Sequence, residues 1–129
     1  MARTQQEQAN AELVKRFFDE VLAPMEADLV DRYVSPGYIQ HSQLAEPGIE
    51  ALKAFLRRVR RETPEARQTL HRLVAEGDLV VTHEHVVRWP GDPGLAAIDI
   101  FRCADGKIVE HWDVIQAVPA EPINPNSMF

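Results

Sequence analysis

Hydrophobic residues in the first half of the chain recur at the spacing of helices. From about residue 5 to 23, apolar side chains return every three or four positions between charged ones, which predicts an amphipathic helix that ends before Pro24. A shorter helix is expected over residues 26–33, and Ser35-Pro36-Gly37 then predicts a break in the chain. Helical spacing returns over residues 49–62. Three helices are therefore expected in this half.

In the second half, the pattern changes to alternating runs rich in β-branched residues. After a short extended stretch at residues 38–41, four strands are expected, over residues 68–75, 79–89, 95–103 and 107–118. Turn sequences separate them, including the hairpin signal Asp105-Gly106. Helices followed by an antiparallel meander predict an α+β fold: a cone-shaped, curved antiparallel sheet of about four to six strands that wraps around three N-terminal helices and encloses a pocket.

Length and composition limit the class of protein. The 129 residues fit one domain over residues 1–129, with N-terminal helices at 5–33, the remaining helix and curved sheet at 38–118, and an irregular tail at 119–129. A net charge of −6 disfavours binding to nucleic acid or to an anionic membrane, and no apolar run is long enough to span a bilayer. A lone cysteine, Cys103, excludes an internal disulfide. With a polar N-terminus, these features favour a cytoplasmic protein.

Side chains two residues apart share one face of a strand, so chemistry can be assigned to faces. Asp99 shares a face with Phe101, and His111 shares one with Asp113 and Ile115. The hairpin at Asp105-Gly106 makes these two faces neighbours. We expect the concave face of the sheet to carry the following residues: Asp99, Phe101, His111, Asp113, and His83 and His85 from the preceding strand.

A pocket lined by two carboxylates and three imidazoles among apolar walls is typical of a small-molecule site. Burial would raise an aspartate pKa or lower a histidine pKa, which suits both groups to proton transfer. Each of these residues taken alone also fits a solvent-facing aspartate or a structural histidine. Two imidazoles in His83-x-His85 could also begin a metal site, completed by ligands such as His41 or Asp99, although this spacing is weakly specific.

The closing strands carry a resemblance to a known family. The run Ala97-Ile98-Asp99-Ile100-Phe101-Arg102 and the run from Asp105-Gly106-Lys107 to His111-Trp112-Asp113 resemble the closing hairpin of the SnoaL-like family. That family belongs to the nuclear transport factor 2-like superfamily, which includes ketosteroid isomerases, and its members are cones of helices wrapped by a curved sheet. The likeness extends from the first helix to about Val118. It implies no metal and no other cofactor.

The resemblance assigns roles to individual positions. Asp99 falls where ketosteroid isomerases hold a protonated aspartate as an oxyanion donor, and His41 falls near their general base. The first helix offers Phe17 and Phe18 but no tyrosine, so the second oxyanion donor of those isomerases is missing there. Asp113 matches the acid/base aspartate of SnoaL-type polyketide cyclases, which close rings by an aldol reaction.

Three functions remain open. The leading hypothesis is cofactor-independent acid/base chemistry next to a carbonyl, in an aldol cyclisation or an isomerisation. Asp113, Asp99 and His41 would then be catalytic, and a small hydrophobic or cyclic carbonyl compound would be bound by Tyr38, His83, His85, Phe101, His111 and Ile115. One alternative is hydrolysis like that of limonene-type epoxide hydrolases, although His83 and His85 stand where those enzymes have an arginine and an aspartate. The other is a non-catalytic pocket that binds a small ligand.

The opposite face of the sheet predicts a partner. An apolar patch is expected on the convex face, where no helix covers it, formed by Val86, Ile98, Ile100, Trp112 and Val114. Members of the superfamily commonly pair through that face, which implies a two-fold homodimer.

Overall fold

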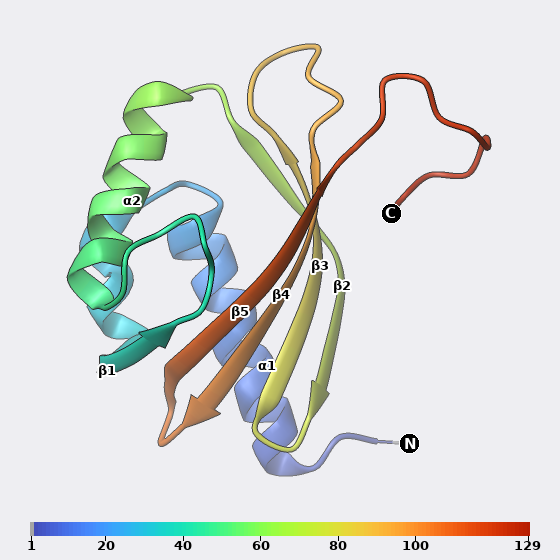
Figure 1. Ribbon diagram of the computed structural model, residues 1–129. Coiled ribbons are helices and arrows are strands. Elements are labelled where there is room, and N and C mark those ends of the chain that lie inside the picture. Colours follow the sequence, from blue (N-terminus) through green and yellow to red (C-terminus); the bar gives the residue numbers. More distant parts are fainter. Residues whose placement is uncertain (1) are drawn as a thin grey trace.

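The computed structural model describes residues 2–129 and contains the helices and strands that the sequence pattern predicts, with small shifts in their bounds. The helical elements are α1 (Gln5–Phe17), its continuation as a π-helical turn η1 (Phe18–Leu22), the 3₁₀ helix η2 (Ala27–Arg32) and α2 (Ile49–Glu62). The strands are β1 (Val34–Gln40), β2 (Arg67–Glu76), β3 (Leu79–Val87), β4 (Leu95–Ala104) and β5 (Lys107–Ala117) (Figure 1).

Local chemistry defines both ends of the first helix. The Thr4 side chain accepts the backbone N–H of Glu7, and the Glu7 carboxylate accepts the backbone N–H of Thr4, which forms a capping box. At the other end the chain passes through Pro24, and Met25 adopts a left-handed conformation with φ of 56°. The predicted helix over residues 5–23 is therefore present as α1 followed by η1.

The sheet has the strand order β1-β5-β4-β3-β2. Strands β2 to β5 form an antiparallel meander, and the turn between β4 and β5 uses Asp105 and Gly106 with φ of 51° and 75°, as the hairpin signal predicted. Strand β1 adds to the edge of β5 in parallel, so the sheet is mixed rather than antiparallel throughout. The predicted break at residues 35–37 lies within β1, where its pairing with β5 is interrupted between Val34 and Ile39. Pro36 lacks the N–H that a regular ladder needs.

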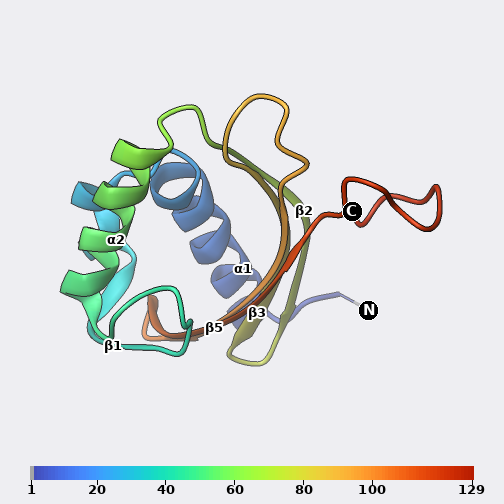
Figure 2. The ribbon, with the colours of Figure 1, turned by 45° about the horizontal axis from the view of Figure 1, so that its top comes forward.

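Helices cover the concave side of the sheet. Figures 1 and 2 show the sheet curving around α1, with α2 and the turns near it on the far side of the cone and the C-terminal tail leaving the end of β5 away from the helices. A continuous core joins the two layers, with its most buried side chains at Val14, Val21, Val30, Leu56, Val80 and Ile108. The predicted α+β cone is confirmed. No helix within residues 2–129 combines the length and the apolar character needed to cross a membrane.

Candidate functional site

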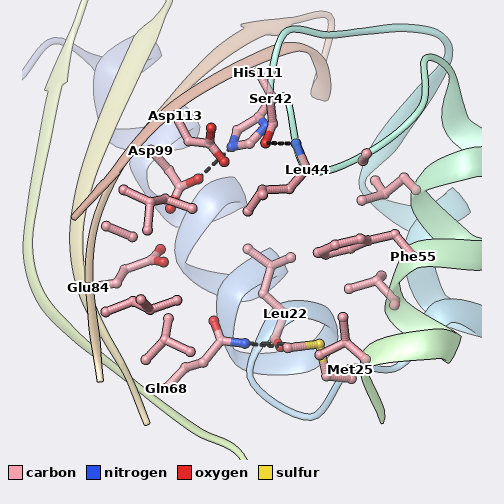
Figure 3. A pocket seen from close by; sticks show the side chains of 18 of the residues that line it. Leu22, Met25, Ser42, Leu44, Phe55, Gln68, Glu84, Asp99, His111 and Asp113 are labelled. Atoms are coloured by element: carbon pink, nitrogen blue, oxygen red, sulfur yellow. Dashed lines mark hydrogen bonds and ion pairs between the residues drawn. The ribbon is translucent and has the colours of Figure 1, made fainter. Parts of the chain in front are cut away.

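A pocket of about 310 Å³ lies between the concave face of β3–β5 and the inner side of α2. Its walls are largely apolar, with Phe55 of α2 and Leu22 facing the sheet across the cavity. Figure 3 shows that Glu84, Asp99, His111 and Asp113 gather on the sheet side. The pocket therefore has an acidic side on the strands and an apolar side on the helices.

Strand pairing brings the acidic residues together. Asp99 of β4 is the cross-strand partner of Asp113 of β5, and Phe101 is the partner of His111. Because side chains alternate along each strand, all four residues, together with Ile115, line the pocket. Phe101 forms an apolar base for the cluster, 2% exposed, with its ring 4.9 Å from the His111 imidazole.

A chain of hydrogen bonds crosses the cluster. The Thr82 hydroxyl donates to the Glu84 carboxyl group at 2.9 Å. Glu84 in turn is hydrogen-bonded to Asp99, and an Asp99 oxygen lies 2.5 Å from Nε2 of His111. Nδ1 of His111 lies 2.7 Å from Oε1 of Gln40. Asp113 stays outside this chain, half-buried beside it.

A backbone donor fixes one proton position in this hydrogen-bonded chain and limits the other to two places. The backbone N–H of Ser42 donates to Oε1 of Gln40, so that oxygen is an acceptor and Nδ1 of His111 must carry a hydrogen. Nε2 of a neutral His111 is then an acceptor, which requires the proton of the close contact to sit on Asp99. If His111 is charged instead, the proton sits on Nε2 and Asp99 is a carboxylate. Asp99 and His111 thus share one proton.

In the hydrogen-bonded chain, burial shifts the pKa of each titratable group in the direction that favours the neutral form of that group. Loss of water, the Asp99 charge and the hydrogen bond to Asp99 raise the pKa of Glu84 to about 9. Loss of water and the charge of Asp113 raise the pKa of Asp99 to about 7, although the hydrogen bond from Glu84 opposes this. Burial also lowers the pKa of His111. At neutral pH Glu84 is therefore a neutral acid that donates to Asp99, and Asp99 titrates where a proton-transfer group is most effective.

Tyr38 places a hydroxyl in the same pocket. It is 6% exposed, and Nε2 of Gln40 donates to its oxygen at 2.8 Å, which leaves the phenol proton free to donate. Burial and the nearby charges of Asp99 and Asp113 raise the pKa of Tyr38 above its ordinary value. The pocket therefore contains a neutral hydroxyl donor close to two carboxyl groups.

His83 and His85 do not line the pocket, so the face predicted for this strand is wrong. Thr82 of β3 is the partner of Asp99 on β4, and cross-strand partners share a face, so the even-numbered residues of β3 point inward. His83 and His85 lie on the convex face, where the ring of Phe129 stacks on both at 5.4 and 4.2 Å. Nε2 of His85 also contacts the Pro93 carbonyl oxygen at 2.8 Å.

His41 also lies outside the pocket. Its Nε2 is 2.6 Å from the Glu110 carboxylate, and its ring stacks on Trp112 at 4.9 Å. Glu110 belongs to the outward face of β5, so this contact draws the imidazole away from Asp99 and Asp113. Val86 shows the opposite error, because it was assigned to the convex face and lines the pocket. Of the predicted site, the structure brings together Tyr38, Asp99, Phe101, His111, Asp113 and Ile115.

Sequence reasoning missed Glu84, Thr82 and Gln40. Glu84 shares a strand face with Val86, and the sequence interpretation puts that face outward because it puts His83 and His85 on the concave face. Gln40 lies in β1, whose pairing with β5 joins residues far apart in the chain. The sequence carries no signal for Glu84, because both faces of this strand alternate apolar with polar residues.

The cluster also satisfies the geometry of a metal-binding group. Ligand atoms of Asp99, His111 and Asp113 lie within 4.8 Å of one another. The alternative metal site that could begin at His83 and His85 is not assembled with Asp99, because these two histidines lie on the other face of the sheet. Asp99 and His111 are bonded to each other, so their contact must open before either could hold a cation.

Cys103 is buried away from this chemistry. It is 3% exposed within the core, and burial raises the pKa of its thiol to about 11. A thiol with a raised pKa has little thiolate at neutral pH, so Cys103 is an inert core residue.

Comparisons with known proteins agree with this architecture. A family model described as a SnoaL-like domain matches residues 14–111. A candidate SnoaL-like polyketide cyclase from Jannaschia sp. CCS1 is 26% identical with a TM-score of 0.75, covering 95% of this chain and 99% of that chain. A candidate polyketide cyclase from Bacillus cereus ATCC 10987 is 24% identical with a TM-score of 0.75, covering 88% of this chain and 78% of that chain.

A more distant structure has the same fold. A candidate ketosteroid isomerase from Kribbella flavida DSM 17836 is 18% identical with a TM-score of 0.73, covering 92% of this chain and 86% of that chain. At these low identities the likeness to the Bacillus and Kribbella proteins concerns the fold alone. Among curated proteins, none matches the sequence.

Proposed function

Because this chain belongs to the SnoaL-like domain family, we propose that it is a cofactor-independent enzyme that moves protons next to the carbonyl of a small organic molecule. The reaction would be an aldol cyclisation or an isomerisation; a cyclase activity is in keeping with the name of the similar Jannaschia protein, a candidate polyketide cyclase. The observation that carries the proposal is the proton shared by Asp99 and His111 beside Asp113, on one side of an apolar pocket.

Asp113 is the base in this proposal. Its half-buried carboxylate would take the proton from the carbon next to the carbonyl, and the electron pair of that C–H bond would form an enolate. Asp113 is outside the hydrogen-bonded chain, so its oxygens remain available to the ligand. A base positioned in this way contributes about 10²-fold or more to the rate.

The enolate oxygen needs a donor, and two are near. The phenol of Tyr38 has a free proton, and Asp99 can supply the proton that it shares with His111. Both lie in a pocket with largely apolar walls, where a preorganised donor stabilises developing charge strongly. Glu84 supports this role because its donated hydrogen bond holds Asp99 in place. Protonation at the new carbon position, or attack on a second carbonyl, would complete isomerisation or cyclisation.

His41 has no part in this reaction. Its contact with Glu110 supports a structural role at the edge between β1 and β5. His83 and His85 likewise support the position of the tail and of the loop before β4. Hydrolysis of the epoxide-hydrolase type gains no support from β3, because Thr82, Glu84 and Val86 face the pocket where an arginine and an aspartate two residues apart are needed.

Exchange of carbon-bound hydrogen tests the proposal without knowledge of the natural substrate. The protein should accelerate loss of the α-proton signal of 2-tetralone in heavy water, measured by proton NMR. Asp113→Asn should reduce the protein-dependent rate about 10²-fold, because an amide cannot accept the proton. Asp78→Asn, at an exposed turn, is the matched control and should leave the rate unchanged. Exchange no faster than in buffer, or equal rates for Asp113→Asn and the wild type, would contradict the proposal.

The convex face supports a homodimer as part of the same proposal. Ile98 is 37% exposed and Val114 is 73% exposed on the outer side of β4 and β5, next to Trp112. A second copy related by a two-fold axis would cover this surface. A cytoplasmic location stays a prediction.

A further inference from the structure

The arginines of α2 divide into two pairs with different surroundings. Arg57 and Arg60 turn toward η2, where they pair with Asp28 and Glu26. Arg58 and Arg61 lie on another side of the helix, and no carboxylate of residues 2–129 forms an ion pair with either. The four arginines therefore do not form one uniform, solvent-facing charged surface.

Arg58 and Arg61 line a groove of about 590 Å³. Ala51, Ala54 and Phe55 precede them on the same side of α2, at helical spacing, and the two small alanines leave the groove open. The guanidinium of Arg58 lies over the Phe55 ring, 5.4 Å from its centroid, which holds the charge at the inner end of the groove.

This groove is continuous with the pocket. Phe55 and Ala45 border both, and so do Gln40, Ser42 and Leu44. In Figure 3, Phe55 lies across the cavity from Asp99 and Glu84. A ligand that fills the pocket would therefore meet carboxyl groups on the sheet side and arginines where the pocket opens into the groove.

We propose that the ligand of the pocket carries an anionic group, such as a carboxylate, sulfonate or phosphate, which Arg58 and Arg61 bind in the groove while its apolar part fills the pocket. The arginines lie in the groove and the carboxyl groups lie on the sheet side of the pocket, so this arrangement favours one orientation of the ligand. The groove contains two arginines and one acidic residue, Glu46, in a protein with a net charge of −6. The orientation presents the uncharged end of the ligand to the carboxyl cluster. This inference rests on the proposed use of the pocket for a small ligand.

Two fluorescent dyes that differ by one anionic group test the proposal directly. The anionic dye 1-anilinonaphthalene-8-sulfonate and its neutral counterpart N-phenyl-1-naphthylamine are titrated into the protein. The double variant Arg58→Ala/Arg61→Ala should weaken binding of the sulfonate dye about fivefold or more, and binding of the neutral dye less than about twofold. Added salt should weaken only the sulfonate dye.

Two further variants locate the effect. Arg57→Ala/Arg60→Ala removes the same charge from the same helix and should leave both affinities unchanged within about twofold. Ala45→Trp, in the loop where pocket and groove meet, should weaken both dyes because it blocks the passage.

Equal losses of sulfonate binding in the two arginine double variants would overturn the anionic subsite. Positive charge anywhere on α2 would then explain the affinity for the sulfonate dye. Unchanged sulfonate binding in Arg58→Ala/Arg61→Ala would overturn it too. If neither dye binds the wild type, the pocket does not take such ligands and the inference fails with it. The dye titrations require no turnover, so their result is separate from the hydrogen-exchange test of acid/base function.

Discussion

Replacing Glu84 by glutamine should stabilise the protein at neutral pH. Glu84 is 3% exposed, and its pKa is about 9 in the folded protein, against an ordinary value of 4.5 for a glutamate in water. The folded state therefore keeps a proton that the unfolded chain releases above about pH 4.5. The contribution of Glu84 to the free energy of unfolding is fully present below that pH. It falls as the pH rises toward 9, because unfolding then releases the proton.

The magnitude follows from the two pKa values. At pH 7 the pH is 2.5 units above the pKa of this carboxyl group in the unfolded chain. Ionisation of the unfolded chain therefore lowers the free energy of unfolding by about 3 kcal/mol. At pH 5 the same effect is below about 1 kcal/mol. The glutamine side chain can donate to Asp99 and accept from Thr82 as the neutral acid does, so Glu84→Gln keeps both hydrogen bonds and removes the titration.

Urea unfolding followed by tryptophan fluorescence at pH 5, 7 and 8 measures this effect. Glu84→Gln should exceed the wild type by about 3 kcal/mol at pH 7, with a smaller gain at pH 5 and a larger one at pH 8. The exposed carboxyl group of Glu76 at the end of β2 supplies a control, since Glu76→Gln should change stability by less than about 0.5 kcal/mol at each pH. A Glu84→Gln protein that is less stable than the wild type, or a gain that does not depend on pH, would refute a neutral Glu84.

Two other predictions follow from the backbone and the outer face. Gly94→Ala should destabilise the protein by about 2 kcal/mol or more, because Gly94 has φ of +94° and an added Cβ would lie 2.4 Å from the Val86 carbonyl oxygen; thermal unfolding measures this, and an unchanged melting temperature would contradict it. Val114→Glu should convert a dimer to monomers in sedimentation velocity, whereas Ile123→Glu in the exposed tail should not; equal sedimentation of both variants would count against the convex interface.

The order and type of the elements could be predicted from the sequence because each depends on local spacing. The apolar period of α1 and α2, the capping box at Thr4 and the hairpin at Asp105-Gly106 act over a few residues. The same turn begins the pairing of β4 with β5, but a bulge at Val109 then shifts the register by one residue, and only with that shift does Asp99 lie opposite Asp113. The parallel addition of β1 did not follow from the sequence either, because α2 and the three strands β2, β3 and β4 separate β1 from β5.

The face of β3 was decided by tertiary structure alone. A loop that contains Arg88 and Asp92, joined by an ion pair, connects β3 to β4, and its length leaves the register undetermined by any turn rule. A shift of one residue exchanges Glu84 for His83 or His85 in the pocket. The hydrophobic pattern does not choose between these faces, because both alternate apolar with polar groups and Phe129 covers part of the outer one.

The chemistry of the site also depends on the tertiary structure. The sequence by itself determined the α+β cone and the hairpin between β4 and β5, since periodicity and a two-residue turn are local properties. The bulge in β5, which sets Asp99 opposite Asp113, belongs to the folded sheet. Only the folded structure brought Gln40 to His111 and Glu84 to Asp99, and there burial and neighbouring charges raise the pKa of both carboxyl groups. A pKa depends on the water and charges around a group, and these come from residues distant in the chain.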